Sequence, residues 1–421
     1  MRSPPEIGRQ PYRNTEPDWK KFFDASADAR ALGLVDAPMF TDRRAGEPIL
    51  IADDSRRDTD SCVVIHGTEA ESPPRETAFG FYYTPRAYAF PPLAPSISVN
   101  PPVLAEPYAL ELWAEKSTMN DILEPLAPRH NVTLVTGVVG ELSATHRLWH
   151  VQRVLAHRKP TRILYVSEHD PAGDRMPVSV ARKIEYLLRR DGLQDLDIRL
   201  NPLVLTRKQG EHYRLPRIPI KDFDKGKRNF EERHGEGAVE LDALEALHPG
   251  ELGRIVEAAI DRYREPTRRA ERENVAIAAD ARDAVREVRA AVLAEFALEI
   301  TALRSAFDAM LTEIEVDQQA LAVIAEQSAE QSRAHVDAIN ARVAAFHERA
   351  SDLCARIGAE IQDRVPAPDE FDWAIPGDAD ERADPLFDSA RDYLGQIDRF
   401  KQHLGQPTSS RGRQAKLKRR S

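Results

Sequence analysis

Carboxylates follow two apolar stretches of this chain of 421 residues, at the point where each stretch ends. Glu115 closes the first stretch, which begins at residue 108, and Glu168 and Asp170 close the second, which begins at residue 162. Residues two apart in a strand point the same way, so Glu168 and Asp170 should project together, beside Glu115 on a neighbouring strand. In an open α/β sheet, ligands bind at the carboxyl ends of the strands. Carboxylates gathered there predict a Mg²⁺ or Mn²⁺ site that faces phosphate groups.

Each of these acids also has an ordinary structural interpretation. Glu115 would be a surface acid near a helix start, and Asp170 would hydrogen-bond to its own backbone in a turn. Glu240, Asp242 and Glu245 form a second acidic group that could join the site. The spacing of the last two also matches a capping box, and we favour that structural interpretation.

Strands and helices must alternate to position these acids. Apolar runs predict strands over 108–115, 132–137, 162–168 and 196–205. Helices are predicted over 118–124, 143–157 and 178–190, the first stopped by Pro125 and the second capped by Ser143. Such repeats imply a parallel sheet with right-handed crossovers. The expected fold class is α/β, a parallel sheet flanked by helices, with a small N-terminal α+β region and a long C-terminal helical arm.

We predict four domains. Residues 1–100 form a small irregular domain with a helix at 17–32, strands at 49–52 and 62–65 that could pair as a hairpin, and a Pro-rich extended linker at 91–107. The α/β domain and an appendage, whose last helix ends near residue 263, occupy 101–265. The arm occupies 266–364, and an acidic linker, a short helix at 385–404 and a basic tail occupy 365–421.

The arm has the composition of a long helix. Between Pro266 and Gly358 the chain contains no Gly or Pro, and apolar residues recur by threes, fours and sevens, the spacing of a coiled coil. Such an arm would pair with a second copy or a partner protein. A polar stretch at 325–335 could instead be a bend that folds the helix back as a hairpin.

Charge and cysteine content set further limits. The net charge of −10 does not indicate nucleic-acid binding by the whole chain, yet residues 411–421 carry six Lys or Arg and no acid. Such a run either holds phosphates or is a solubilising tail. The two cysteines give neither a disulfide framework nor a zinc signature, and no apolar run approaches the roughly 20 residues that span a bilayer. We therefore expect a cytoplasmic protein without a membrane-spanning segment.

The order of the acids resembles the Toprim domain, which topoisomerases, bacterial primases and OLD-family nucleases share. The Toprim pattern is a Glu after the first strand, a Gly after the second and an Asp-x-Asp after the third. It is matched here by Glu115, by Gly137 or Gly140, and by Glu168-His169-Asp170. The motif residues over about 108–215 are most similar to those of the A subunit of type IIB topoisomerases and its relatives that make meiotic double-strand breaks.

This resemblance implies roles for individual residues. Glu115 would ligate the metal or act as general base, and Lys116 would offset charge on the phosphate. Glu168 and Asp170 would hold Mg²⁺, and Asp174 could add an oxygen, because Glu168 stands where the family has Asp. In the helix that follows, two basic residues could contact a nucleic-acid backbone, although most such charges are simply solvated. These are Arg182 and Lys183.

The expected function is Mg²⁺-dependent, nuclease-like cleavage of DNA. One alternative is a non-catalytic DNA-binding or scaffolding component with a degenerate Toprim domain. Another is a topoisomerase-like subunit whose partner supplies the nucleophilic tyrosine, because Tyr82, Tyr83 and Tyr88 lie in no winged-helix pattern. A primase-like nucleotidyl transferase ranks last.

Overall fold

A computed structural model of the chain describes residues 13, 15–35, 49–52, 59–67, 70–79, 82–137, 144–222, 224, 226–325, 328–381 and 384–408. The chain forms two compact units, each assembled from separate stretches. Unit 1 combines Met1–Arg56, Ala105–Thr267 and Pro376–Ser421, and unit 2 combines Arg57–Leu104 and Arg268–Ile375. The first 100 residues therefore contribute to both units.

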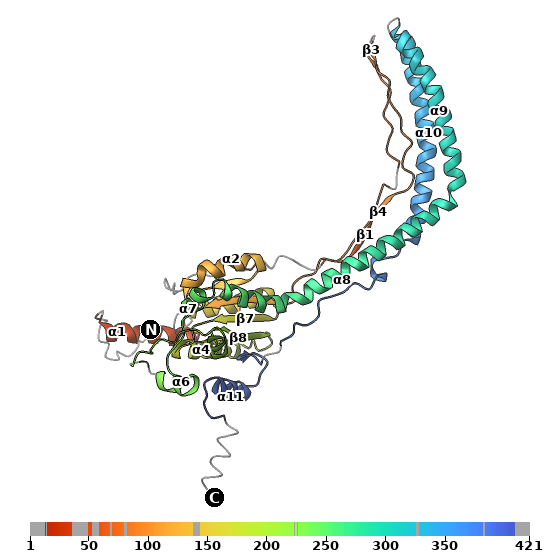
Figure 1. The fold of residues 1–421 in the computed structure, drawn as a ribbon. Coiled ribbons are helices and arrows are strands. Elements are labelled where there is room, and N and C mark those ends of the chain that lie inside the picture. Colours follow the sequence, from red (N-terminus) through yellow and green to blue (C-terminus); the bar gives the residue numbers. More distant parts are fainter. Residues whose placement is uncertain are drawn as a thin grey trace, which may run out of the picture. The chain divides into compact units, whose positions relative to one another are not determined.

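Unit 1 is built around a five-stranded sheet with the strand order β6-β5-β7-β8-β9 (Figure 1). The strands are β5 (Ala109–Ala114), β6 (Thr133–Val135), β7 (Thr161–Val166), β8 (Ile198–Val204) and β9 (Phe387–Asp388). The first four run parallel, and β9 runs antiparallel to β8. The mixed α/β class and the mostly parallel sheet are therefore as the sequence predicts.

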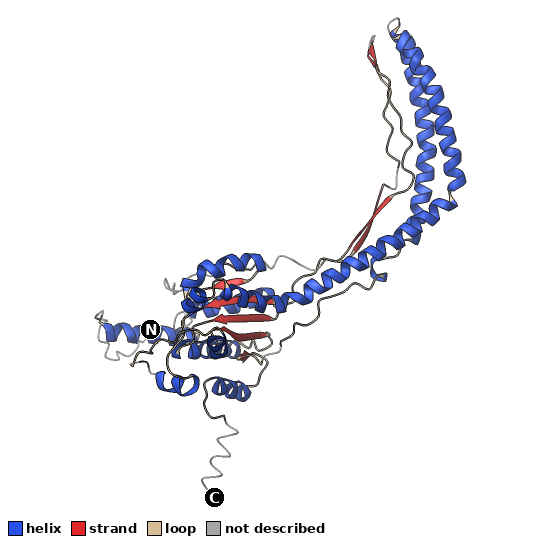
Figure 2. Ribbon diagram, in the orientation of Figure 1, coloured by secondary structure: helices blue, strands red, loops and turns tan. Residues whose placement is uncertain are grey.

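Helices cover both faces of this sheet (Figure 2). One face packs against α2 (Asn120–His130), α7 (Leu241–Leu247) and the start of α8 (Glu251–Glu295). The other packs against α3 (Ala144–His157), α4 (Pro171–Arg190) and α11 (Tyr393–His403). Leu112 of β5 lies in the first core and Trp113 in the second, because successive side chains of a strand point to opposite faces. Burial on both faces explains why these strands read as continuous apolar runs.

The remaining elements of unit 1 are shorter or lie at its periphery. They are α1 (Glu16–Ala31), which matches the helix predicted at 17–32, the 3-10 helix η2 (Ser117–Met119), α5 (Arg207–His212) and α6 (Lys227–His234).

Unit 2 consists of a helical hairpin and a two-stranded ribbon that follows it (Figure 1). Its helices are α9 (Ala297–Ile324), α10 (Ala329–Arg364) and the end of α8, and a 3-10 helix, η3 (Pro368–Glu370), follows α10. The ribbon pairs β1 (Cys62–His66) with β4 (Ser96–Asn100), and β2 (Ala78–Phe79) with β3 (Tyr82–Tyr83).

The apolar seam of the arm is buried within the chain. Ile314 of α9 and Ile339 of α10 belong to one core. The Glu299 carboxylate accepts two hydrogen bonds from Arg356 across the hairpin, at 2.7 and 2.9 Å. Helix α9 ends at Ile324 and α10 begins at Ala329 with Ser328 as its N-cap, so the chain reverses at the start of the polar stretch at 325–335. The hairpin prediction is confirmed, and pairing of the arm with a second chain stays a prediction.

Several element boundaries were predicted wrongly around prolines. Helix α2 continues through Pro125 and Pro128, because both lie on its exposed face, where water can satisfy the carbonyls that a proline ring frees. Helix α8 likewise passes Pro266 and ends at Glu295, not near residue 263. Helix α4 begins at Pro171, so residues 171–173 are its first turn rather than a separate turn.

Long-range strand pairing accounts for the other errors. Leu50 bridges Leu134 of β6, so residues 49–52 join the sheet of unit 1 instead of pairing with 62–65. The partner of β1 is β4, which lies inside the predicted linker at 91–107. The helix predicted at 385–404 begins only at Tyr393, because residues 387–388 form β9. In the described part of the chain, no helix is long and apolar enough to cross a bilayer.

Candidate functional site

The sheet of unit 1 has a topological switch point between β5 and β7. From β5 the chain crosses to β6 on one side, and it then returns to the other side of β5 to form β7 and β8. Open α/β sheets bind ligands at the carboxyl ends of the two strands that flank such a point. Glu115 directly follows β5 and Glu168 follows β7 by two residues. The Glu115 N–H also donates to the Val166 carbonyl at 2.9 Å, which ties the two strand ends together.

We call Glu115, Glu168 and Asp170 the carboxylate corner. Glu115 and Glu168 are each only 6% exposed. Burial raises the pKa of Glu115 to about 7, with further contributions from the charges of Asp170 and Glu168, while a backbone hydrogen bond from Glu168 and the charge of Lys116 oppose the rise. Its Oε2 atom has no hydrogen-bond partner among the described residues. Glu115 is therefore near both other acids, and one of its buried oxygens has no described partner.

Asp170 has a structural role at the corner. Its Oδ1 atom accepts a hydrogen bond from the Gly173 N–H at 2.6 Å, which makes it the N-cap of α4. The structural interpretation of Asp170 predicted that it hydrogen-bonds to the nearby backbone, and it does so as a helix cap. The turn requires Gly173, because a Cβ there would lie 2.1 Å from the Glu168 carbonyl oxygen. The cap thus fixes the distance between the end of β7 and the start of α4.

Lys116 is bound to the corner. Its Nζ donates to Glu168 Oε1 at 2.7 Å. Burial lowers the pKa of Lys116, but the hydrogen bond and the charge of Glu168, together with Glu240 and Asp242, raise it more, so the net shift is upward. Burial also raises the pKa of Glu168, although Lys116 opposes the rise. The lysine therefore acts as the counter-ion of a buried carboxylate.

Glu240 and Asp242 reach the corner from the appendage. His169 and Val239 exchange two backbone hydrogen bonds, of 3.0 and 2.9 Å, and this bridge brings the start of α7 beside the end of β7. Glu240 is the N-cap residue of α7, yet its side chain forms no cap hydrogen bond. Our sequence interpretation of this group as a capping box missed this placement. No local signal could have shown it, because the bridge joins residues 70 positions apart.

Glu245, the third acid of that group, is occupied elsewhere. Its carboxylate accepts hydrogen bonds from the Gly250 and Leu252 N–H groups, both at 2.8 Å, at the start of α8. It is a structural residue, although not in the capping box that its spacing predicts.

Asp174 has partners of its own outside the corner. It pairs with Arg233 of α6, and His234 and His403 approach its Oδ1 atom to 3.6 and 3.7 Å. Burial alone would raise its pKa, but hydrogen bonds from His234 and Arg233 lower it to about 2. The side chain anchors α6 and α11 to the first turn of α4, so it does not supply the predicted extra oxygen.

The basic residues predicted to contact nucleic acid lie further along α4. The Arg182 guanidinium lies over the ring of Phe400 in α11, 5.5 Å from the ring centre. Lys183 is half-buried on the same helix. Gly137, one of the two glycines that could match the Toprim pattern, has a positive φ of 69°. The other, Gly140, lies outside the described residues, as do Ser143 and the basic tail at 411–421.

Tyr165 is a further residue near the corner that the sequence did not single out. Its side chain is fully buried in β7, and its hydroxyl has no hydrogen-bond partner among the described residues. Burial and, to a lesser extent, the charge of Glu115 raise the pKa of the phenol, so it stays protonated.

Whether the corner fits a divalent cation depends on Glu115 and Lys116. Nowhere in the described ranges do three His, Cys, Asp or Glu side chains already stand close enough to share a metal ion. The donor set is nevertheless suited to Mg²⁺: oxygen ligands only, with one buried oxygen of Glu115 left without a partner. The residue types therefore suit a divalent cation, but the described side chains are not assembled around one, and Lys116 occupies Glu168 instead.

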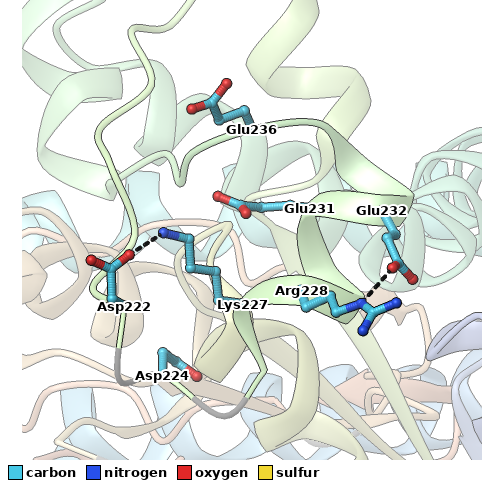
Figure 3. Close-up of a pocket in the computed structure, with 7 residues that line it drawn as sticks. All are labelled: Asp222, Asp224, Lys227, Arg228, Glu231, Glu232 and Glu236. Atoms are coloured by element: carbon cyan, nitrogen blue, oxygen red, sulfur yellow. Dashed lines mark hydrogen bonds and ion pairs between the residues drawn. The ribbon is translucent and has the colours of Figure 1, made fainter.

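A separate acidic hollow lies along α6 and the loop before it (Figure 3). Its lining comprises Asp222, Asp224, Lys227, Arg228, Glu231, Glu232 and Glu236, and none of the corner residues. Lys227 pairs with Asp222 at 2.7 Å and Arg228 with Glu232 at 2.9 Å, so its charges are partly balanced.

No known family model, curated protein or solved structure matches this chain.

Proposed function

We propose that this chain is a divalent-cation-dependent DNA-processing protein that cleaves phosphodiester bonds at the carboxylate corner, as the resemblance to Toprim nucleases implies. The observation that carries the proposal is the position of Glu115 beside Glu168 and Asp170 at the switch point of the sheet, with a pKa raised to about 7 by burial and by those two acids. Perturbed acids gathered at such a point are typical of functional sites.

The corner's own residues divide the chemistry among them. A bound Mg²⁺ would activate water and offset charge on the phosphate. Glu115, whose pKa lies near neutrality, can accept a proton from an attacking water. Asp170, whose Oδ1 atom accepts the Gly173 N–H, would hold the ion beside Glu168. Lys116, once free of Glu168, can reach a phosphate as a point charge.

Cleavage of supercoiled plasmid DNA tests this proposal. We expect nicked or linear products with Mg²⁺ or Mn²⁺, none with EDTA, and a rate that rises with pH through about 7 as Glu115 loses its proton. Glu115→Gln should lower the rate at least about 100-fold, the usual scale of a general base. Glu236→Gln, the same change in the acidic hollow along α6, should leave the rate unchanged. If wild type and Glu115→Gln give the same products, or neither gives any, the proposal fails.

The Lys116–Glu168 pair favours one alternative, a non-catalytic DNA-binding platform in which the lysine replaces the metal permanently. A cation that is covalently part of the chain cannot activate water. Such a protein would bind DNA equally well with EDTA and with Mg²⁺ in a gel-shift assay, and it would leave the plasmid intact.

A further inference from the structure

Among the corner carboxylates, Glu168 is the one paired with a cation of the chain. The Lys116–Glu168 pair is short, at 2.7 Å, and its acid is 6% exposed whereas its lysine is 35% exposed. A buried carboxylate needs a compensating charge, but the lysine, being partly open to solvent, can leave without opening the core. The pair is thus asymmetric: Glu168 is fixed and Lys116 is movable.

The backbone places Lys116 on the opposite side of the strand end from Glu115. Lys116 is extended, with φ −107° and ψ 138°, and adjacent side chains of an extended segment point apart. Lys116 therefore approaches Glu168 from the side of α7, where Glu240 and Asp242 add to the negative charge around it. The Lys116 ammonium group thus binds Glu168, after β7, and lies in the field of Glu240 and Asp242, at the start of α7.

We propose that Lys116 is a built-in counter-cation, which a divalent ion must displace from Glu168 before the corner is complete. This inference rests on the proposed function, because it requires that the corner take up a divalent cation. Without the ion, the lysine keeps Glu168 neutralised and in position. With the ion, Glu168 becomes a ligand and the ammonium group is released toward solvent or a substrate phosphate.

Calorimetric titration with Mn²⁺ compares wild type, Lys116→Gln and Lys208→Gln. Lys208 is an exposed lysine of α5 and serves as the matched control. Removing the competitor should tighten Mn²⁺ binding by Lys116→Gln about tenfold or more, whereas Lys208→Gln should bind as wild type does. Equal or weaker binding by Lys116→Gln overturns the inference but leaves the proposed function standing. Absence of binding by every form overturns both.

Lysine reactivity gives a readout in the unmutated chain, in case Lys116→Gln does not fold. Acylation of Lys116 by an N-hydroxysuccinimide ester, followed by mass spectrometry, should increase severalfold when saturating Mg²⁺ is added. Lys208 in the same sample should react at an unchanged rate. A Lys116 reactivity that is the same with and without Mg²⁺ contradicts displacement.

Discussion

A carboxylate that is buried without a cationic partner destabilises the fold when it is charged, and Glu115 is in that situation. Its raised pKa means that the folded state holds a proton that the unfolded state loses between pH 4.5 and about 7. The free energy of unfolding therefore falls across this window as pH rises. Glu115→Gln removes the charge, so we expect it to stabilise the metal-free protein at pH 8 by up to about 3 kcal/mol, at 1.36 kcal/mol per pKa unit.

Urea unfolding of both forms at pH 8 and pH 4.5 measures this difference. The gain should be present at pH 8 and should nearly vanish at pH 4.5, where Glu115 is protonated in the folded state and about half protonated in the unfolded state. Glu124→Gln on the exposed face of α2 provides the control. A Glu115→Gln protein that is less stable than wild type at pH 8 would show that Glu115 has a compensating partner.

At the scale of elements, the start of α4 depends on Gly173. A Cβ at this position would meet the Glu168 backbone oxygen at 2.1 Å, and a backbone atom cannot move aside as a side chain can. Gly173→Ala should therefore destabilise unit 1 by about 1–3 kcal/mol and shift Glu168. Gly377→Ala, where nothing lies within 4 Å of the added carbon, should cost little. Thermal melts of the two variants decide, and equal melting temperatures would contradict the close approach.

The helical hairpin makes a second prediction at this scale. Ile339 is fully buried in the core shared by α9 and α10, so Ile339→Ala should cost about 2–5 kcal/mol of stability. Val316 of α9 is 63% exposed, and Val316→Ala should cost under about 0.5 kcal/mol. Because the seam is buried within one chain, the effects of these two substitutions should be the same at low and at high protein concentration. A strong concentration dependence would indicate pairing between chains instead.

The sequence predicted elements best where the signal was local. The strands β5, β6, β7 and β8 were each found within a few residues, because burial on both faces gives continuous apolar runs. The start of α4 could also have been found, since Asp170-Pro171 is a capping residue followed by a proline at the first helical position. The pairing of β1 with β4 could not have been predicted. The two strands are separated by 29 residues, and only tertiary packing selects the partner.

The site residues also divide into those with a local sequence signal and those placed by long-range contacts. The pattern of acids and glycines pointed to Glu115, Glu168 and Asp170, and the strand order brings them to one sheet edge. It did not show that Lys116 would pair with Glu168, because an exposed lysine is the ordinary case. Neither could it show that Asp174 would be taken up by Arg233, whose helix lies 59 residues further along the chain.

At the scale of the whole molecule, the proposed function depends on one topological fact: the order in which strands are added to the sheet reverses between β5 and β7, and acids follow both strands. Unit 2 contributes no residue to this corner, since every acid named in it and Lys116 belong to unit 1. We therefore predict that cation binding is a property of unit 1. It should depend on the three acids of the carboxylate corner and should be opposed by Lys116.

Calorimetric titration of Mn²⁺ into wild type and Glu115→Gln at pH 8 and pH 6 tests this central claim most directly. Wild type should bind Mn²⁺ more tightly at pH 8 than at pH 6, because below about pH 7 protons compete for Glu115. Glu115→Gln should bind at least about tenfold more weakly at pH 8 and lose most of the pH dependence. If wild type releases no binding heat, or if the two proteins bind Mn²⁺ equally, the carboxylate corner is not a cation site.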